Sequence, residues 1–505
     1  MSVSQVISTL RGKIAGLLAQ EQDHHNPVKT VTPGMPELLR SAAADGAVLL
    51  HNRVLPFGKG TAVSVFGRVQ LDWFCTGYGS GGDVNAPYQV GLLEGLENCQ
   101  ELRLHAPLAE TYRAWVKEHP ADHGYWGNWP RSHPEMPLTR ELVTKAREAT
   151  PHAVVAIGRA SGEDRENILE GGSFLLTEEE TRMLRAVTEQ FESAVLVLNI
   201  GSVMDFSFLE EFLPKLGAVL ILWQGGMESG NAAADLLCGK VSPSGRLTDT
   251  IARTYDDYPS AANFGDKDAN RYEEDIYVGY RWFETFDKDK VLYPFGYGLS
   301  YTSFEYSDLK VSDRAVSLQV TNTGTVGGAD VVQLYVVPPK DGIFRPAKEL
   351  KGFERVELNS GESKKVEFAL DDRSFAIWSD GWKIPGGTYT VQIGASCRDI
   401  RLEHSLEIAG AEIAPPAWQK DSWYETLSGC PTREEWEQLM GHPVPIIPEP
   451  QKGQFTMDST CMEMKDHSLI IKILYKALEL VMAKRFGGKV DYDNPEFRMM
   501  MCMAA

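Results

Sequence analysis

The sequence predicts an α/β protein: an open, mostly parallel sheet in an α/β/α sandwich, followed by an all-β sandwich and a helical tail. Four short runs rich in β-branched residues are apolar throughout, which is typical of strands buried on both faces of a parallel sheet. Helical segments separate these runs, and this alternation indicates an open sheet covered by helices. The candidate strands are TAVSVF (61–66), AVVAIG (153–158), AVLVLN (194–199) and AVLILW (218–223).

The α/β domain is expected to span residues 36–300, after an N-terminal helix and linker at 1–35. The N-terminal segment has no continuous apolar core and no small-residue cleavage site, so it predicts an amphipathic helix and not a signal peptide. The domain is expected to open with a helical stretch, PELLRSAAADGAVLL. Further helices are expected at 178–192 and at 229–239. In such sheets, ligands bind at the carboxyl ends of the strands.

The pattern changes to period two over residues 301–409. Runs that alternate apolar and polar residues are separated by turn signals such as NTGTVGG and LNSGES. This pattern predicts a small β-sandwich of immunoglobulin or fibronectin type III-like form. The clearest candidate strands are AVSLQVTN (315–322), DVVQLYVVPP (330–339), KKVEFAL (364–370) and TYTVQIG (388–394).

Residues 410–505 are expected to form a linker and a helical tail. PTREEWEQLMG (431–441) and DHSLIIKILYKALELVMAKRFGG (466–488) predict helices, the second with Asp466 as its N-cap. The chain ends in an apolar, Met-rich run, FRMMMCMAA, that we expect to be uncovered within this chain. Either this run packs on a neighbouring surface, or the chain is a truncated version of a longer one.

Composition excludes several classes of partner. The chain has 505 residues, 43% of them apolar, and a net charge of -20. Nucleic acid and anionic membranes both attract basic patches, so neither is expected as a partner. The apolar run at 469–482 is interrupted by three charged residues and is too short to span a bilayer. The seven cysteines form no CxxC pair, which predicts reduced thiols and a cytoplasmic protein.

The first candidate site is the glycine-rich loop TGYGSGGDV (76–84). Gly79 and Gly81 allow backbone to approach a ligand closely, and the Ser80 hydroxyl can bond a hydroxyl group. A dinucleotide loop would follow its strand directly with G-x-G-x-x-G spacing, and this loop does neither. A G-x-S-x-G nucleophile elbow is also absent, because Tyr78 stands where its first glycine would be. A ligand loop and a plain flexible loop remain as alternatives.

The second candidate is Glu163, in GRASGED (158–164), directly after a predicted buried strand. The glutamates at 178–180 have a structural explanation, because Thr177 is a good N-cap and the helix dipole favours carboxylates in the first turn. Glu163 has no such explanation. From the residues alone, a solvated loop carboxylate and a functional carboxylate both remain open.

The third candidate is the aromatic segment EHPADHGYWGNWPRSHPE (118–135). A proline breaks the helix that would place the first two histidines on one face, and no cysteine accompanies them. We therefore expect neither a metal site nor another cofactor. Its aromatic rings either stack on sugar faces or fill a cleft between domains. The histidines are His119, His123 and His133, and the rings are those of Tyr125, Trp126 and Trp129.

Ten stretches between residues 36 and 409 together resemble glycoside hydrolase family 3, which includes many bacterial β-glucosidases. The last two resemble the fibronectin-like domain of that family. The stretches are AAADGAVLLHN (42–52), FGRVQLDWFCTGYGSGGDV (66–84), GRASGED (158–164), LLTEEE (175–180), LNIGSVMD (198–205), WQGGMESGNAAADLLCGKVSPSGRL (223–247), YEEDIYVGYRWFE (272–284), YPFGYGLSYTSFEY (293–306), TNTGTVGGADVVQLYV (321–336) and LKGFERVELNSGES (350–363).

The resemblance implies a retaining hydrolysis of β-glucosides or oligosaccharides by two carboxylates. Glu163 matches the acid/base of the family, and Ser80 matches a position that contacts the sugar in the first subsite. Glu163 must then hold a proton near neutral pH. A partly desolvated loop and the neighbouring Asp164 and Glu166 would favour this, whereas Arg159 and Arg165 would oppose it.

The sequence departs from the family because no (β/α)8 barrel is recognisable. The family carries its nucleophilic Asp on that barrel, which needs about 200 residues or more, and no nucleophile is found in this chain. The sequence therefore predicts the acid/base half of a β-glucosidase, weak or inactive alone, with the barrel in a partner chain or lost by truncation. A homo-oligomer is a further expectation. A non-catalytic carbohydrate-binding or assembly module is the main alternative, and a nucleotide-binding protein is the least favoured.

Overall fold

The structure of the protein is a computed structural model. It describes residues 30–78, 86–122, 130–162, 167–264, 272–312, 314–415, 420, 422–426, 431–444, 451–457, 459–485, 488–492, 497 and 500–501.

The first domain is built on an open sheet, which confirms the predicted α/β class. Across the described residues the sheet has six strands in the order β1-β6-β5-β4-β2-β3. All neighbouring strands are parallel except β1, which runs antiparallel to β6. The strands are β1 (Val48–Asn52), β2 (Thr61–Phe66), β3 (Leu102–Leu104), β4 (His152–Arg159), β5 (Ala194–Ile200) and β6 (Leu216–Ile221).

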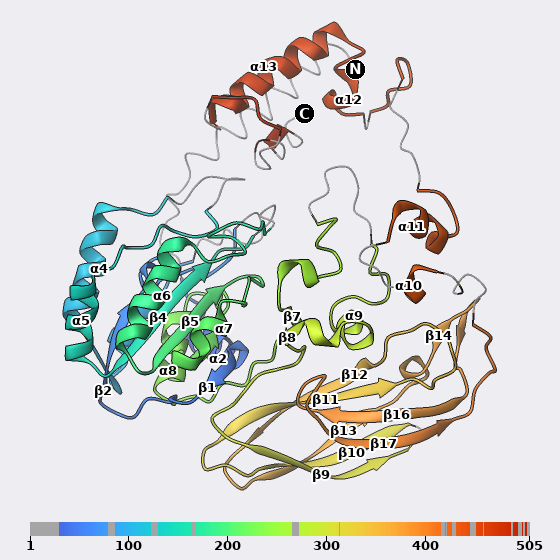
Figure 1. The fold of residues 1–505 in the computed structure, drawn as a ribbon, viewed down its shortest axis with the longest axis horizontal. Coiled ribbons are helices and arrows are strands. Elements are labelled where there is room, and N and C mark those ends of the chain that lie inside the picture. The colour runs from blue at the N-terminus through green and yellow to red at the C-terminus, as the bar shows by residue number, and fades with distance from the viewer. Residues whose placement is uncertain are drawn as a thin grey trace.

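Helices cover both faces of this sheet (Figure 1). Side chains alternate between the faces, so in β5 Val195 and Val197 join one core while Leu196 and Leu198 join the other. Because both cores are apolar, the strand is apolar throughout, as the sequence predicted. One face carries α2 (Met35–Gly46), α3 (Leu92–Asn98) and α8 (Ser229–Leu237); the other carries α4 (Ala106–Glu118), α5 (Arg140–Ala149), α6 (Glu178–Gln190) and α7 (Leu209–Phe212).

The predicted opening helix was wrong in its last residues. Helix α2 ends at Gly46, and Ala47 is already extended. The following Val48, Leu49 and Leu50 are buried in strand β1, where Val48 lies opposite Ile221 of β6. Their burial between two apolar layers outweighs their helix propensity, so the run joins the sheet as an antiparallel edge strand.

The second domain is a β-sandwich, as predicted. A sheet ordered β13-β10-β9 packs on a sheet ordered β12-β11-β16-β17, and their inward-facing side chains share one apolar core (Figure 1). The strands are β9 (Phe304–Val311), β10 (Ala315–Asn322), β11 (Gly328–Val337), β12 (Glu349–Leu358), β13 (Ser363–Ala369), β16 (Gly387–Gly394) and β17 (Ile400–Ile408), with a short hairpin of β14 (Ile377–Trp378) and β15 (Trp382–Lys383). Between the domains lie β7 (Ile251–Ala252), α9 (Tyr280–Thr285) and β8 (Val291–Tyr293).

A buried ion pair joins the two domains. Arg246 Nη2 lies 2.5 Å from Asp330 Oδ1, and the hydroxyl of Tyr306 donates to Asp330 Oδ2 at 2.9 Å. The Asp330 side chain is buried, and 9% of the Arg246 side chain is exposed. Since both carboxylate oxygens accept a bond, Asp330 ties the segment before β7 to strands β9 and β11.

We expect Asp330→Asn to lower the free energy of unfolding by about 2 kcal/mol, because charge-assisted bonds to a buried arginine are replaced by neutral ones. Scanning calorimetry should show a lower midpoint for the sandwich. Asp372→Asn is the matched control, since Asp372 pairs with Arg314 at an exposed site. An equal effect of both substitutions would contradict the assignment of Asp330 as an interdomain contact.

The helical tail differs from the prediction at two points. Helix α13 begins at Leu469, and Ser468, not Asp466, accepts a bond from the helical N–H of Ile471. The described residues of the Met-rich end, Phe497, Met500 and Met501, are not uncovered as predicted, because they are buried in a cluster with residues of α13. The tail comprises α10 (Trp423–Thr426), α11 (Arg433–Met440), α12 (Cys461–Met464) and α13 (Leu469–Arg485).

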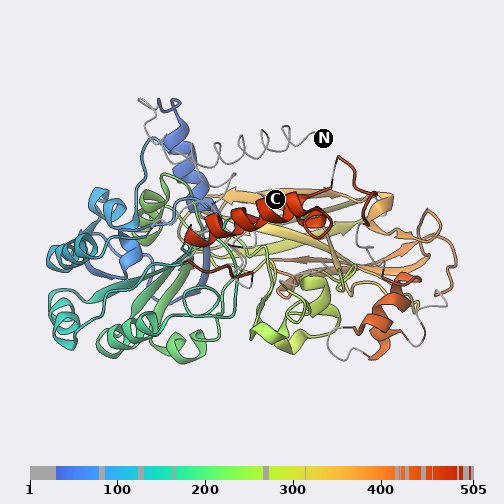
Figure 2. The same ribbon diagram turned by 90° about the horizontal axis from the view of Figure 1, so that it is seen from above.

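Helix α13 stands apart from the two domains in Figure 1 and crosses in front of their junction in Figure 2. No helix in the part of the chain that the structure describes is long and apolar enough to cross a membrane.

Candidate active site at the carboxyl end of the parallel sheet

The order in which the chain adds strands to the sheet reverses between β2 and β4. From β2 the chain passes to β3 on one side, and the following strand, β4, lies on the other side of β2. At such a switch point the loops after the two strands diverge and leave a crevice at the carboxyl ends, where α/β proteins bind ligands. The loops after β2 and β4 are the two that carry the predicted residues Ser80 and Glu163.

A backbone bridge joins the bases of these two loops. Tyr78 pairs with Gly162 as an isolated parallel bridge, and the Tyr78 N–H donates to Ser161 O at 2.9 Å. A Cβ at Gly162 would lie 2.4 Å from Tyr78 O, and one at Gly77 would lie 2.7 Å from Ser161 O. The glycines therefore permit a contact between the loops that other residues would obstruct.

The predicted site residues themselves lie outside the described residues. They are Glu163, Gly79, Ser80, Gly81, Trp126 and Trp129. Tyr78 and Gly162, the residues directly before Gly79 and Glu163, are described and paired.

The aromatic segment returns to the same place. The backbone N–H of Ala160, which follows β4, donates to Arg131 O at 2.7 Å. His133 stacks on Phe74 with ring centroids 5.0 Å apart. Arg131 and His133, which follow Trp129 in the sequence, thus lie against both candidate loops.

The two described histidines of this segment each stack on an aromatic ring. His119 stacks on Trp115 at 4.5 Å between centroids, and His133 stacks on Phe74. His123 lies outside the described residues.

The loop after β6 also contributes to this carboxyl end of the sheet. Ser161 Oγ donates to Gln224 Oε1 at 3.1 Å. A Cβ at Gly201, after β5, would lie 2.0 Å from Ser161 Oγ and 2.3 Å from Gln224 Oε1. The loops after β4, β5 and β6 therefore meet around the hydroxyl of Ser161, two residues before Glu163.

A buried ion pair that sequence reasoning missed supports the loop after β4. Arg159, the last residue of β4, donates to both carboxylate oxygens of Glu180, at 2.7 and 2.6 Å. It also donates to Ser173 O and Leu175 O, each at 2.9 Å. Only 2% of Arg159 and 5% of Glu180 is exposed. Arg159 therefore binds the start and end of the segment 160–177 to one another.

Glu180 has a second role at the start of α6. Its backbone N–H donates to Thr177 Oγ1 at 3.1 Å, and its Oε2 accepts from the Thr177 N–H at 2.8 Å. This capping box confirms Thr177 as the N-cap. The sequence signal for the cap was visible, whereas the pairing of Glu180 with Arg159 had none, because it depends on packing between strand and helix.

A second buried carboxylate lies next to this pair. Glu135 Oε2 accepts from the Arg68 N–H, and its Oε1 accepts from the Met136 N–H, both at 2.7 Å. Burial raises the pKa of Glu135 to about 7, although the two N–H groups act in the opposite direction and Glu180 adds to the rise.

Glu135 should make stability depend on pH. Its ordinary pKa is 4.5, so between that pH and about 7 the folded protein holds a proton that the unfolded chain has released. The free energy of unfolding should therefore fall as pH rises through this interval, by about 3 kcal/mol.

Glu135→Gln removes this titration. In urea unfolding at pH 4.5 and at about pH 7.5, the stability of the variant relative to the wild type should rise by about 3 kcal/mol toward the higher pH. Glu141→Gln is the control, because Glu141 is exposed on α5 and pairs with Lys145. A difference that does not change with pH would contradict the raised pKa.

Two known domain families match this chain. The model of the Glycosyl hydrolase family 3 C-terminal domain matches residues 47–301, and that of the Fibronectin type III-like domain matches residues 330–397. A beta-glucosidase of Ruminococcus albus is 41% identical over 382 residues, which cover 72% of this chain and 40% of the relative.

Solved structures agree with these matches. A β-glucosidase from Paenibacillus barengoltzii has a TM-score of 0.72 and 40% identity, covering 77% of this chain and 46% of that one. β-Glucosidase 3B from Thermotoga neapolitana, in complex with α-D-glucose, has a TM-score of 0.68 and 35% identity, covering 74% and 54%. This chain thus spans about half the length of the relatives that it matches. Because the family model spans half of the residues, the chain belongs to glycosyl hydrolase family 3.

Proposed function

We propose that this chain supplies the acid/base half of a retaining β-glucosidase site, with Glu163 as the acid/base. The observation that carries the proposal is the bridge between Tyr78 and Gly162, which joins the bases of the Ser80 and Glu163 loops at the switch point of the sheet. The beta-glucosidase names of several relatives support a β-glucoside or an oligosaccharide as substrate.

Glu163 would act twice in the reaction. In the first step its carboxylic acid donates a proton to the glycosidic oxygen while a nucleophile attacks the anomeric carbon, and the alcohol leaves. In the second step its carboxylate takes a proton from water, which displaces the nucleophile. Ser80 would bond a sugar hydroxyl in the first subsite, and Trp126 and Trp129 would stack on sugar faces.

The nucleophile is assigned to a (β/α)8 barrel carried by a partner polypeptide. Retaining enzymes need a second carboxylate about 5 Å from the first. In the described residues the long strands form one open sheet and one sandwich, and none forms a closed barrel. The loops after β2 and β4 lie at the carboxyl ends of the parallel strands, so the barrel would dock at that end of the sheet.

Hydrolysis of an aryl β-glucoside tests the proposal. The purified chain alone should give almost no turnover, and the chain mixed with the barrel polypeptide should give saturable turnover, because both carboxylates are required. Barrel with a Glu163→Gln chain is the matched control and should be strongly impaired. Clear turnover by the isolated chain that survives Glu163→Gln would overturn both the acid/base assignment and the division of the site.

The proposal places the enzyme in the cytoplasm. Cys75, Cys99, Cys238, Cys397 and Cys461 carry free thiols, which fits a reducing compartment. Alkylation of the cell-extracted protein before any reductant is added should label all seven cysteines. A disulfide found by mass mapping would contradict this location.

A further inference from the structure

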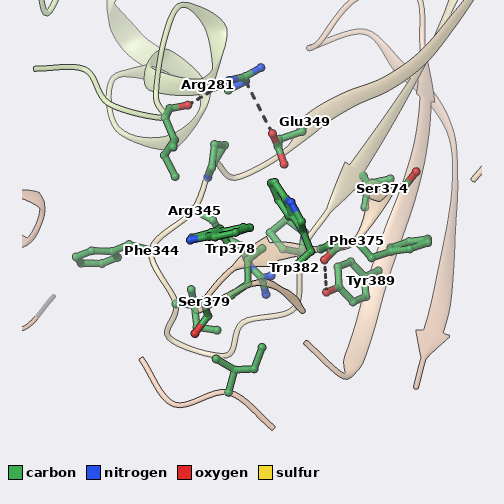
Figure 3. A pocket seen from close by; sticks show the side chains of 18 of the residues that line it. Arg281, Phe344, Arg345, Glu349, Ser374, Phe375, Trp378, Ser379, Trp382 and Tyr389 are labelled. Carbon is green, nitrogen blue, oxygen red and sulfur yellow. Dashed lines mark hydrogen bonds and ion pairs between the residues drawn. The ribbon is translucent and has the colours of Figure 1, made fainter. Parts of the chain in front are cut away.

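A cavity of about 750 Å³ lies at one end of the β-sandwich (Figure 3). Its walls come from the β14–β15 hairpin, the segment between β11 and β12, and the residues just before α9. Its volume is within the range of small-molecule sites. Figure 1 places β14 at the far side of the molecule from β4, so this cavity is separate from the candidate active site.

Two tryptophans of the hairpin line the cavity. Trp378 is 67% exposed and Trp382 is 52% exposed, and their rings meet edge to face with centroids 5.4 Å apart. The hairpin turns through Asp380 and Gly381, both with positive φ. The guanidinium of Arg373 lies 3.3 Å from the centre of the Trp382 ring. Trp382 is therefore held in place by a cation, while Trp378 presents a large apolar surface to solvent.

Planar polar groups lie beside the rings. The Arg345 side chain is 9% exposed and pairs with Asp341 Oδ2 at 2.5 Å. Its Nε is buried and has no hydrogen-bond partner among the described residues. On the opposite wall Arg281 Nε lies 4.0 Å from Glu349 Oε1. Figure 3 shows Arg345, Trp378 and Trp382 gathered at the centre of the cavity.

These features favour a neutral polyhydroxylated ligand. Positive and negative side chains nearly balance in the walls, so neither an anion nor a cation is strongly attracted. A pyranose ring combines an apolar face, which suits an indole, with hydroxyls, which suit guanidinium and carboxylate groups in bidentate contacts. The side chains of Arg281 and Glu349, which are 39% and 37% exposed, can reach such hydroxyls.

We infer that this cavity is a second, non-catalytic carbohydrate site, which binds a neutral glucan oligosaccharide by stacking on Trp378 and by hydrogen bonds to Arg281 and Glu349. The choice of a glucan rests on the proposed function, whereas the choice of a neutral sugar rests on the cavity.

Calorimetric titration with laminarihexaose and with cellohexaose tests the inference. The wild-type chain should bind at least one of them, and Trp378→Ala should lower the affinity at least tenfold. Trp378→Phe should lower it less, because a smaller ring still stacks. Phe353→Ala is the matched control, since Phe353 is an exposed aromatic of the same domain that does not line the cavity. Thermal midpoints should confirm that each variant is folded.

The outcomes separate this inference from the proposed function. Glu163→Gln should leave hexasaccharide binding at the cavity unchanged. Binding that depends on Trp378 would therefore support the second site even if the chain mixed with a barrel polypeptide hydrolyses nothing. The inference is overturned if neither hexasaccharide binds, as expected for a surface that contacts a protein partner. It is equally overturned if Trp378→Ala and Phe353→Ala bind alike.

Discussion

Glu163→Gln should lower kcat/KM of the barrel-complemented enzyme about 10²–10⁴-fold on a β-glucoside with an alkyl leaving group, because the departing oxygen then receives no proton. Glutamine keeps the size of the side chain and removes only its acid and base function. The measurement is steady-state hydrolysis of methyl β-glucoside at the pH optimum of the wild type.

The dependence on the leaving group distinguishes an acid/base from a residue that only shapes the loop. A dinitrophenolate leaves without a proton, so the first step should be nearly normal in Glu163→Gln with a dinitrophenyl glucoside. The second step still needs a base, so the glycosyl-enzyme should accumulate and give a burst of product. Glu170→Gln, at an exposed position in the same segment between β4 and α6, is the control and should show neither effect. An equal loss of kcat/KM with the alkyl and the dinitrophenyl glucoside would contradict the role of Glu163.

Arg159→Ala should lower the free energy of unfolding of the α/β domain by about 3–5 kcal/mol, because it leaves the carboxylate of Glu180 buried without its partner. It also leaves Ser173 O and Leu175 O without their donor. The segment 160–177, which includes Glu163, should then lose its fixed ends. Urea unfolding, followed by circular dichroism, measures the loss.

The matched variants identify the cause. Arg159→Lys keeps the charge but not the two-pronged contact, so it should be intermediate in stability. The double variant Arg159→Ala/Glu180→Ala should cost less than the sum of the single variants, since no charge is then left unpaired. Arg182→Ala removes exposed pairs on the same helix and should change stability by less than about 1 kcal/mol. Additive losses at Arg159 and Glu180 would contradict a direct ion pair.

The fold was predictable where the pattern of apolar residues along the sequence follows the burial of a regular strand. Strands β2, β4 and β5 are apolar on both faces, and β10 alternates, so their sequences indicate both the element and the kind of sheet. β1 was not predictable, because Val48–Leu50 continue a helical pattern and are recruited by pairing with β6. The burial of Met500 and Met501 was not predictable either, because it depends on packing against another element, helix α13.

The site was predictable only in part. Thr177 and Glu180 match a capping box, which is a local signal. The buried pairing of Arg159 with Glu180 and the raised pKa of Glu135 arise from contacts between distant segments, for which a single sequence has no period or motif. The same holds for the bridge between Tyr78 and Gly162, although Gly77 and Gly162 leave the room that this contact needs.

Covalent labelling tests most directly the claim that this chain holds the acid/base but not the nucleophile. Fluorine at C2 of a dinitrophenyl glucoside destabilises the positively charged transition state, while the activated leaving group keeps the first step possible without an acid, so the glycosyl-enzyme is trapped. After incubation of chain and barrel, peptide mapping by mass spectrometry should find the label on a carboxylate of the barrel, with wild-type chain and with Glu163→Gln alike. A label on any carboxylate of this chain would contradict the account.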